Sequence, residues 1–424
     1  MNIIINELKK IWRVKILAII TFLCIGYFVL FMNHYIEHYP RGTWGGSVDF
    51  AHHLTENYGT SLTFSDFEEF LDYREIMASE LDLFIASNTI FTDAGIYDFQ
   101  SYEAFLVDSD YRYETLTESE RSLRYTLLLE FGYAIRSDFI YEGETVELQS
   151  DNEIPISYMR IRSFDNVVAM YQESVLGESE WESRIDSLIY NSSLSRNEVQ
   201  RLITIRDSGE LQNITPQHAI WHTLSYVQSL AILTILVTLI LVFPFAIATK
   251  RAEKNLLQPS PNQGQFSLKK QFIAVLISAV GITTILVIIF AGIFSTTEVQ
   301  AFWNNGINSF LSDIFHWLSI TFGQYVLLMI GVIYLLSIAT ATFTFVLSYF
   351  SKNMKGLALK SILLFIALLM LSNWILNNFL VVVMGRNVLI KISLLAFLQV
   401  VGVAGAMIAI RREKTNEDLK RHKL

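Results

Sequence analysis

The feature that most constrains this chain is a set of six long apolar runs. Each is long enough, or nearly so, for the roughly 20 residues that a helix needs to cross the hydrocarbon core of a bilayer. Hydrophobic residues make up 52% of the sequence, and charged residues make up only 17%, against about a quarter in a typical soluble domain. We therefore predict transmembrane helices over 16–32, 225–248, 272–294, 324–350, 357–376 and 388–410.

The charged residues are divided unevenly between the loops. Residues 33–220 carry 34 acidic and 12 basic side chains, whereas the rest of the chain carries 7 acidic and 20 basic ones. Lysine and arginine collect on the cytoplasmic side of membrane proteins. This rule predicts that segments 1–15, 249–271 and 411–424 are cytoplasmic, together with the short loop after the fourth helix. Segments 33–222 and 295–323 are then external, and both termini lie in the cytoplasm.

The first apolar run resembles a signal peptide only in part. Four basic residues precede it, but the sequence that follows Phe28 offers no small-x-small cleavage site. We therefore predict that 16–32 remains as the first transmembrane helix. The single cysteine, Cys24, lies within this run, so the external domain contains no disulfide. A large external domain without disulfides is more typical of a bacterial plasma membrane.

The acidic external domain over 33–222 reads as mainly helical. Three capping boxes open amphipathic stretches, at 65–68, 117–120 and 195–198. The first is followed by a candidate buried stripe made of Phe67, Phe70, Leu71, Ile76, Leu81, Phe84 and Ile85. Short strands are expected near 145–148 and 154–160, and a helix lying in the membrane interface is expected in 295–323. The fold class is thus an all-α polytopic membrane protein with a helical external domain.

The sequence lacks the residues that ion-coupled transport, nucleotide binding and nucleophilic catalysis require. The apolar runs hold no Asp, Glu, His or Arg, and their two lysines, Lys360 and Lys391, are near the ends. Ion-coupled transporters usually place ionisable groups near the midplane. The chain has no Gly-rich nucleotide loop, no nucleophile motif and no external basic patch for nucleic acid. We predict a protein that is not an enzyme, binds no cofactor or nucleic acid, and takes energy from a partner.

Two segments predicted to be cytoplasmic could receive that partner. Segment 1–15 is amphipathic and leads into the first transmembrane helix. Loop 249–271 is polar with an apolar insert, and Pro259 and Pro261 interrupt it, so a short helix, a turn and a second short helix are expected.

In its layout the chain resembles the type-2 family of ABC exporter permeases. The layout comprises an amphipathic start, one helix, a large external loop, five more helices and a charged loop after the second helix. The local match in that loop is formed by Glu253, Lys254, Leu256, Leu257, Ser260, Pro261, Gly264 and Lys269. The resemblance implies a loop that couples to a separate cytoplasmic ATPase, which binds the ATP, and a homo- or heterodimer of permeases. It implies coupling roles for Glu253, Lys254, Leu257, Gln258, Pro259 and Ser260.

Two histidine pairs flank the external domain. His34 and His38 are four residues apart, as are His218 and His222, which places each pair on one helical face where it could hold zinc. The alternative interpretation is that they are interfacial residues among neighbouring aromatic side chains. We favour the second interpretation and predict no metal site.

Two functions from different classes remain open. The preferred hypothesis is the permease subunit of an ATP-driven exporter in the bacterial plasma membrane, which moves a peptide or an amphiphilic, lipid-like molecule out of the cell. The alternative is a receptor or scaffold that transports nothing and whose external domain binds a ligand.

Overall fold

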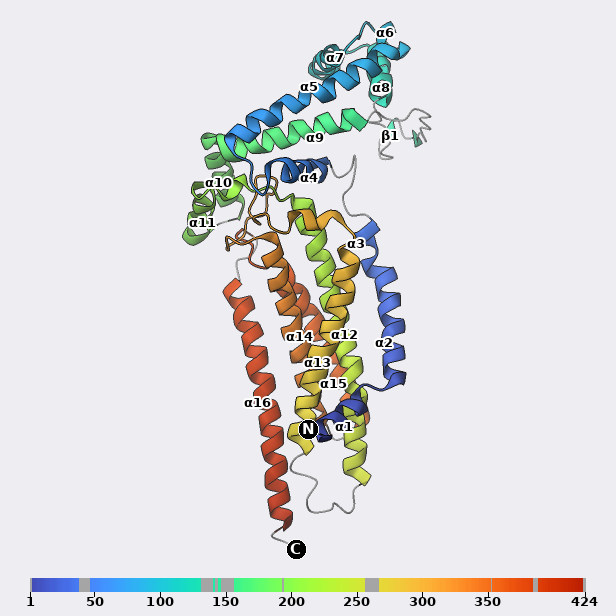
Figure 1. Ribbon diagram of the computed structural model, residues 1–424, viewed down its shortest axis with the longest axis vertical. Coiled ribbons are helices and arrows are strands. Elements are labelled where there is room, and N and C mark those ends of the chain that lie inside the picture. Colours follow the sequence, from blue (N-terminus) through green and yellow to red (C-terminus); the bar gives the residue numbers. More distant parts are fainter. Residues whose placement is uncertain are drawn as a thin grey trace. The chain divides into compact units, whose positions relative to one another are not determined.

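The computed structural model describes residues 2–37, 46–130, 140–141, 144–145, 156–192, 194–255, 267–351, 353–383 and 388–421. Among them, six helices are long and apolar enough to cross a bilayer, so the chain has the character of a multi-pass membrane protein. The chain divides into two units. Unit 1 comprises Met1–Tyr39 and Ser183–Leu424 and contains all six helices, and unit 2 comprises Pro40–Glu182 (Figure 1).

Unit 1 is a helical bundle in which every predicted span coincides with a helix. The spans are carried by α2 (Val14–Tyr27) continued by a π-helical turn (Phe28–Met32), α12 (Gln217–Asn255), α13 (Ser267–Phe294), α14 (Phe322–Phe350), α15 (Met354–Leu376) and α16 (Val388–Arg421). Three shorter helices accompany them, namely α1 (Asn2–Ile11), α3 (His34–Glu37) and α11 (Arg196–Asp207). Helix α10 (Glu178–Ser192) crosses the boundary between the units.

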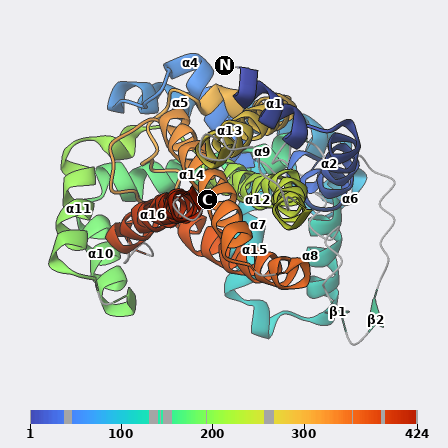
Figure 2. The ribbon, with the colours of Figure 1, turned by 90° about the horizontal axis from the view of Figure 1, so that it is seen from below.

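Helices α12 and α14 form the centre of the bundle (Figure 2). They pack against each other along their length, and α13, α15 and α16 pack around them. The buried share of the apolar window is 61% in α12 and 56% in α14 but only 6% in α2. Helix α2 is therefore a peripheral helix with most of its apolar surface turned outward, as expected for a helix that faces lipid.

Close packing of α16 on α14 depends on small residues. A Cβ atom added to Gly402 would lie 2.9 Å from Cγ2 of Thr342, and one added to Gly405 would lie 3.2 Å from Val346. Ala406 and Ala409 continue the same buried face of α16. Small residues let helix backbones approach each other in membranes, where dispersion contacts replace the hydrophobic effect as the force between helices.

Unit 2 is helical with its own aromatic core. Its elements are α4 (Gly46–Tyr58), α5 (Phe64–Ser87), α6 (Thr89–Asp93), α7 (Phe99–Tyr111), α8 (Glu118–Glu130), the two-residue strands β1 (Ile140–Tyr141) and β2 (Glu144–Thr145), and α9 (Ile156–Tyr171). Helices α4 and α5 both pack on α9. The rings of Phe50 and Phe70 lie 5.8 and 4.5 Å from the ring of Phe164. The strand expected over 154–160 is wrong, because α9 begins at Ile156.

Two of the three capping boxes occur as predicted. The Ser195 hydroxyl accepts from the backbone N–H of Glu198, whose carboxylate accepts in return from the Ser195 N–H. Thr117 and Glu120 exchange the same pair of bonds. At α5 the cap is Thr63 with Asp66, not the Ser65 pair expected from the sequence. Thr63 has the extended backbone that a cap requires.

The segment expected to hold an interfacial helix forms a folded cap instead. Residues 295–321 contain one short 3₁₀ turn, Glu298–Phe302, and otherwise irregular backbone with Phe310 and Phe315 buried. We call this segment, with 196–216 and 377–383, the distal cap, because it lies at the end of the bundle opposite α1 (Figure 1). Its backbone groups bond within the distal cap in place of a helix: the Ile307 N–H donates to the Ile320 carbonyl, and the Phe310 N–H donates to the Leu211 carbonyl.

Candidate functional site

Helix α1 packs against one end of the transmembrane bundle. It packs on α13 and on α12. The indole Nε1 of Trp12 donates a hydrogen bond of 2.9 Å to the Ser278 hydroxyl, and Ile11 is completely buried. Glu7 is buried as well and pairs with Lys10 at 2.7 Å. We call α1, Trp12 and the α13 surface that they contact the α1 dock.

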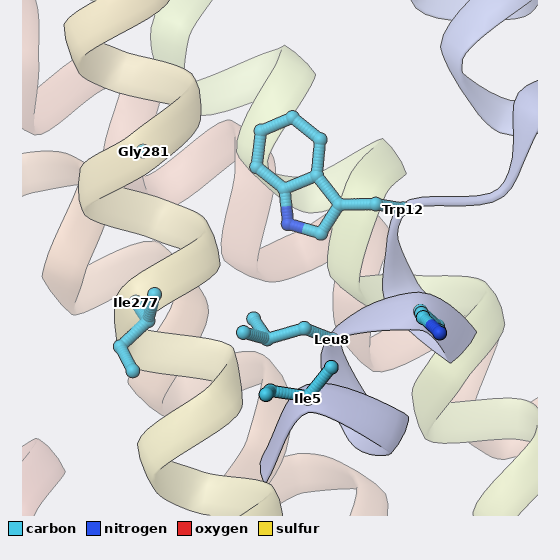
Figure 3. Close-up of a pocket in the computed structure, with 6 residues that line it drawn as sticks. Ile5, Leu8, Trp12, Ile277 and Gly281 are labelled. Atoms are coloured by element: carbon cyan, nitrogen blue, oxygen red, sulfur yellow. The ribbon is translucent and has the colours of Figure 1, made fainter. Parts of the chain in front are cut away.

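A groove runs between α1 and α13 within this dock. It has a volume of about 420 Å³ and is lined by Ile5, Leu8, Lys9, Trp12, Ile277 and Gly281. Figure 3 shows Ile5, Leu8 and Trp12 reaching from α1 toward α13. A Cβ atom added to Gly281 would lie 3.4 Å from the Trp12 ring, so glycine lets the indole lie close to the helix backbone.

The residues predicted to couple to an ATPase belong to the same end of the bundle. Glu253 and Lys254 lie in the last turns of α12, which runs unbroken to Asn255. Leu257, Gln258, Pro259 and Ser260 lie outside the described residues. The loop that contains them joins α12 to α13, and both of these helices contact α1. The predicted coupling loop and α1 therefore share one end of the bundle.

Among the described residues, the middle of the bundle contains buried polar side chains that are neutral hydroxyls. The Ser337 hydroxyl of α14 lies 2.9 Å from the Thr238 hydroxyl of α12 and accepts from Thr283 of α13 at 2.8 Å. All three side chains are fully buried. Hydroxyl groups that bond each other across helices hold the three central helices together without placing a charge in the membrane.

Buried ionisable side chains in the described spans lie toward the distal cap. Lys391, in the first turn of α16, donates to the carbonyl oxygen of Asn377 at 2.6 Å and lies 5.7 Å from the Trp374 ring. His222 lies in the second turn of α12. A lysine bonded to the carbonyls that end a helix stabilises that end, because the helix dipole is negative there. These contacts assign Lys391 a role in fixing the C-terminal end of α15.

The histidine pairs lie among aromatic rings. Helix α3 is beside α12, and the ring of Tyr35 meets the ring of His222 edge-on at 6.3 Å. His34 lies 5.5 Å from Tyr35, His218 is exposed, and His38 is outside the described residues. Over the part of the chain that the structure describes, no three His, Cys, Asp or Glu side chains come close enough to hold a metal ion.

The distal cap contains a partly buried charged network that the sequence did not reveal. Arg201 of α11 donates two bonds to the Glu210 carboxylate, at 3.0 and 2.9 Å. Asn308 donates to the same carboxylate at 2.5 Å, and Ser319 donates at 2.8 Å. Burial alone would raise the pKa of Glu210, but the bonds from these three residues outweigh it and hold the pKa below its ordinary value. The network joins α11 to the segment 295–321.

His316 is enclosed by this network. Its ring is 1% exposed and stands edge-on to Tyr325 at 4.9 Å, and neither ring nitrogen has a hydrogen-bond partner among the described residues. Its backbone carbonyl accepts from Arg201. Burial, with the nearby charge of Arg201 second, lowers the pKa of His316 to about 3. The imidazole is therefore neutral in the folded protein at any ordinary pH.

No family model matches the chain, and no curated protein or solved structure matches it either. The structure itself has the character of a multi-pass membrane protein, with an amphipathic helix docked on its central bundle.

Proposed function

We propose that the chain is the permease subunit of an ATP-driven exporter in a bacterial plasma membrane, with α1 and the loop after α12 on the cytoplasmic side. The observation that carries the proposal is the α1 dock. Helix α1 is bound through Trp12 to Ser278 of α13, in the half of α13 that is nearer to the connection between α12 and α13. A force applied to that connection by a partner is thereby applied to two central helices and to α1 together.

The energy source in this proposal is a separate ATPase. The buried polar side chains at the middle of the described spans are hydroxyls, such as Ser337 and Thr238, which neither bind nor release protons at physiological pH. Proton- or sodium-driven transport relies on ionisable or chelating groups near the midplane. Apolar walls with neutral hydroxyls favour a peptide or an amphiphilic, lipid-like substrate.

Co-purification is the first test. The full chain, tagged and extracted in a mild detergent, should retain an ATPase whose turnover rises when the permease is present. Recovery of the chain alone, with a ligand bound to unit 2, would instead support the receptor hypothesis. Unit 2 has its own aromatic core around Phe164, which is the observation in favour of that alternative.

A triple variant tests the coupling loop. Replacement of Glu253, Lys254 and Gln258 by alanine should leave insertion and yield unchanged but should abolish stimulation of the ATPase by substrate. The double replacement of Lys355 and Lys360 by alanine is the matched control, because both are exposed on α15 at the same end of the bundle. Unchanged stimulation and export in the triple variant would contradict the coupling role.

A further inference from the structure

The groove in the α1 dock lies within the membrane, in the half nearer to α1. Ser278, which binds Trp12, precedes the end of α13 at Phe294 by 16 residues, which is about 24 Å at 1.5 Å per residue. The hydrocarbon core is about 30 Å thick. If Phe294 marks one boundary of the core, Ser278 lies about 6 Å inside the other boundary. The groove thus begins at the interface and extends among the acyl chains of one leaflet.

The walls of the groove face lipid. Ile5 is 41% exposed and Ile277 is 46% exposed, and these two side chains edge the opening. Leu8, Trp12 and the bare backbone of Gly281 form the floor (Figure 3). The volume of about 420 Å³ is within the range of ligand pockets, roughly 300–1,000 Å³. An apolar groove that opens toward hydrocarbon is filled by an acyl chain.

The mouth of the groove is basic. Lys9 lines it and is exposed, and Arg13 and Lys15 are exposed nearby on the same segment. The one acidic residue of α1, Glu7, is turned into the protein and pairs with Lys10. Lys9 therefore stands with its charge available at the level of the lipid headgroups, where a basic side chain attracts anionic lipid.

We propose that the groove between α1 and α13 is a binding site for an anionic phospholipid. One acyl chain lies on Leu8, Trp12 and Gly281, and the headgroup phosphate pairs with Lys9. The bound lipid fills the space between α1 and the bundle and so ties α1 to α13. This lipid stays bound in the α1 dock and is not a transported substrate, and its binding requires no ATPase.

Fluorescence quenching by brominated lipids tests the site. The full chain is reconstituted into phosphatidylcholine vesicles that contain increasing fractions of phosphatidylglycerol, with bromine on the acyl chains of one lipid or the other. The signal of Trp12 is the difference between the protein and its Trp12→Phe variant. We expect brominated phosphatidylglycerol to quench Trp12 more strongly than brominated phosphatidylcholine at equal mole fraction. Lys9→Glu should lower that preference about fivefold or more.

Two further variants distinguish loss of the groove from loss of folding. Gly281→Leu fills the floor and should reduce quenching of Trp12 by both lipids, while Lys360→Glu, an exposed lysine of α15 that does not line the groove, should leave the preference unchanged. Each variant must match the parent in thermal unfolding before it is compared. Equal quenching by the two lipids, or a preference that survives Lys9→Glu, would overturn the assignment to anionic lipid. Absence of any Trp12 quenching would overturn the lipid site itself, because it would show that lipid does not enter the groove.

Discussion

The neutral, buried imidazole of His316 makes the distal cap sensitive to acid. Histidine in an unfolded chain has a pKa of about 6.5, whereas burial lowers the pKa of folded His316 to about 3. Between these two values the unfolded chain binds a proton that the folded chain excludes. Stability is therefore fully present above pH 6.5, and falls as the pH drops toward 3.

The magnitude follows from the unfolded pKa, because pH 5 lies well above the folded pKa of about 3. At pH 5 the unfolded histidine is about 1.5 units below its pKa, and each unit is worth about 1.4 kcal/mol. His316 should thus cost the folded state about 2 kcal/mol between pH 7.5 and pH 5. For unit 1, which contains His316, this cost corresponds to a fall of roughly 4 °C in Tm.

His316→Phe isolates this effect. The substitution keeps a ring beside Tyr325 and removes the two ring nitrogens that lack partners. Thermal unfolding of the detergent-solubilised full chain is followed by tryptophan fluorescence at pH 7.5 and at pH 5. We expect the parent to lose roughly 4 °C more than the variant over this interval, and we expect the variant to be the more stable protein at both pH values.

His218→Gln is the matched control, because His218 is exposed on α12 and its replacement should leave the loss between pH 7.5 and pH 5 unchanged. Equal losses in the parent and in His316→Phe would refute the argument that the imidazole titrates only on unfolding.

Two further perturbations test the packing and the charged network. Gly402→Leu places a side chain where a Cβ alone would lie 2.9 Å from Thr342. It should therefore destabilise the folded protein by about 1–3 kcal/mol or more and lower the Tm of the detergent-solubilised chain. The control is Gly26→Leu in α2, where an added Cβ would have no atom within 4 Å and the Tm should stay unchanged. Arg201→Met removes the cation beside the partly buried Glu210 carboxylate, which keeps its hydrogen bonds from Asn308 and Ser319. The loss should be about 1–3 kcal/mol, and the double variant with Glu210→Gln should recover most of it. If the single and double variants melt at the same temperature, the pair is not coupled.

The transmembrane helices could be predicted from the sequence because apolarity over a sufficient length is a local property. Their ends could not. The second span was expected from residue 225, but α12 begins at Gln217, and α16 runs to Arg421, beyond the expected 410. A helix continues through polar residues while its backbone bonds are satisfied, whereas hydropathy detects only the part that lies in hydrocarbon.

The buried stripe of α5 was predicted in part. Phe67, Phe70 and Leu81 are buried as expected, but Ile76 is 57% exposed. Periodicity assigns an average face to a helix of 24 residues, and a helix that long meets different partners along its length. Which partners it meets is a tertiary property, and the sequence pattern does not contain it.

The distal cap and the α1 dock show what pairing information the sequence lacked. The aromatic spacing of 303–317 suited a helix, yet the Asn308 side chain accepts from the backbone N–H of His316 within this segment, and Asn305 donates to the carbonyl of Ile214 outside it. That asparagine content was the available signal, because Asn competes with the helix for backbone hydrogen bonds. The bond between Trp12 and Ser278 joins residues 266 positions apart, and no local pattern identifies such a pair. The coupling roles of Glu253 and Lys254 stay predictions.

The hydroxyl cluster of Ser337 has a consequence for the electrical behaviour of the bundle. Moving one elementary charge across the membrane potential is worth about 2.3 kcal/mol per 100 mV. The contacts that would have to exchange when α12, α13 and α14 shift are between neutral groups, and the buried Lys391 lies at the edge of the membrane. Exchange of these neutral contacts moves no charge across the field. Among the described residues, a shift of α12, α13 and α14 at this cluster would therefore depend little on the membrane potential.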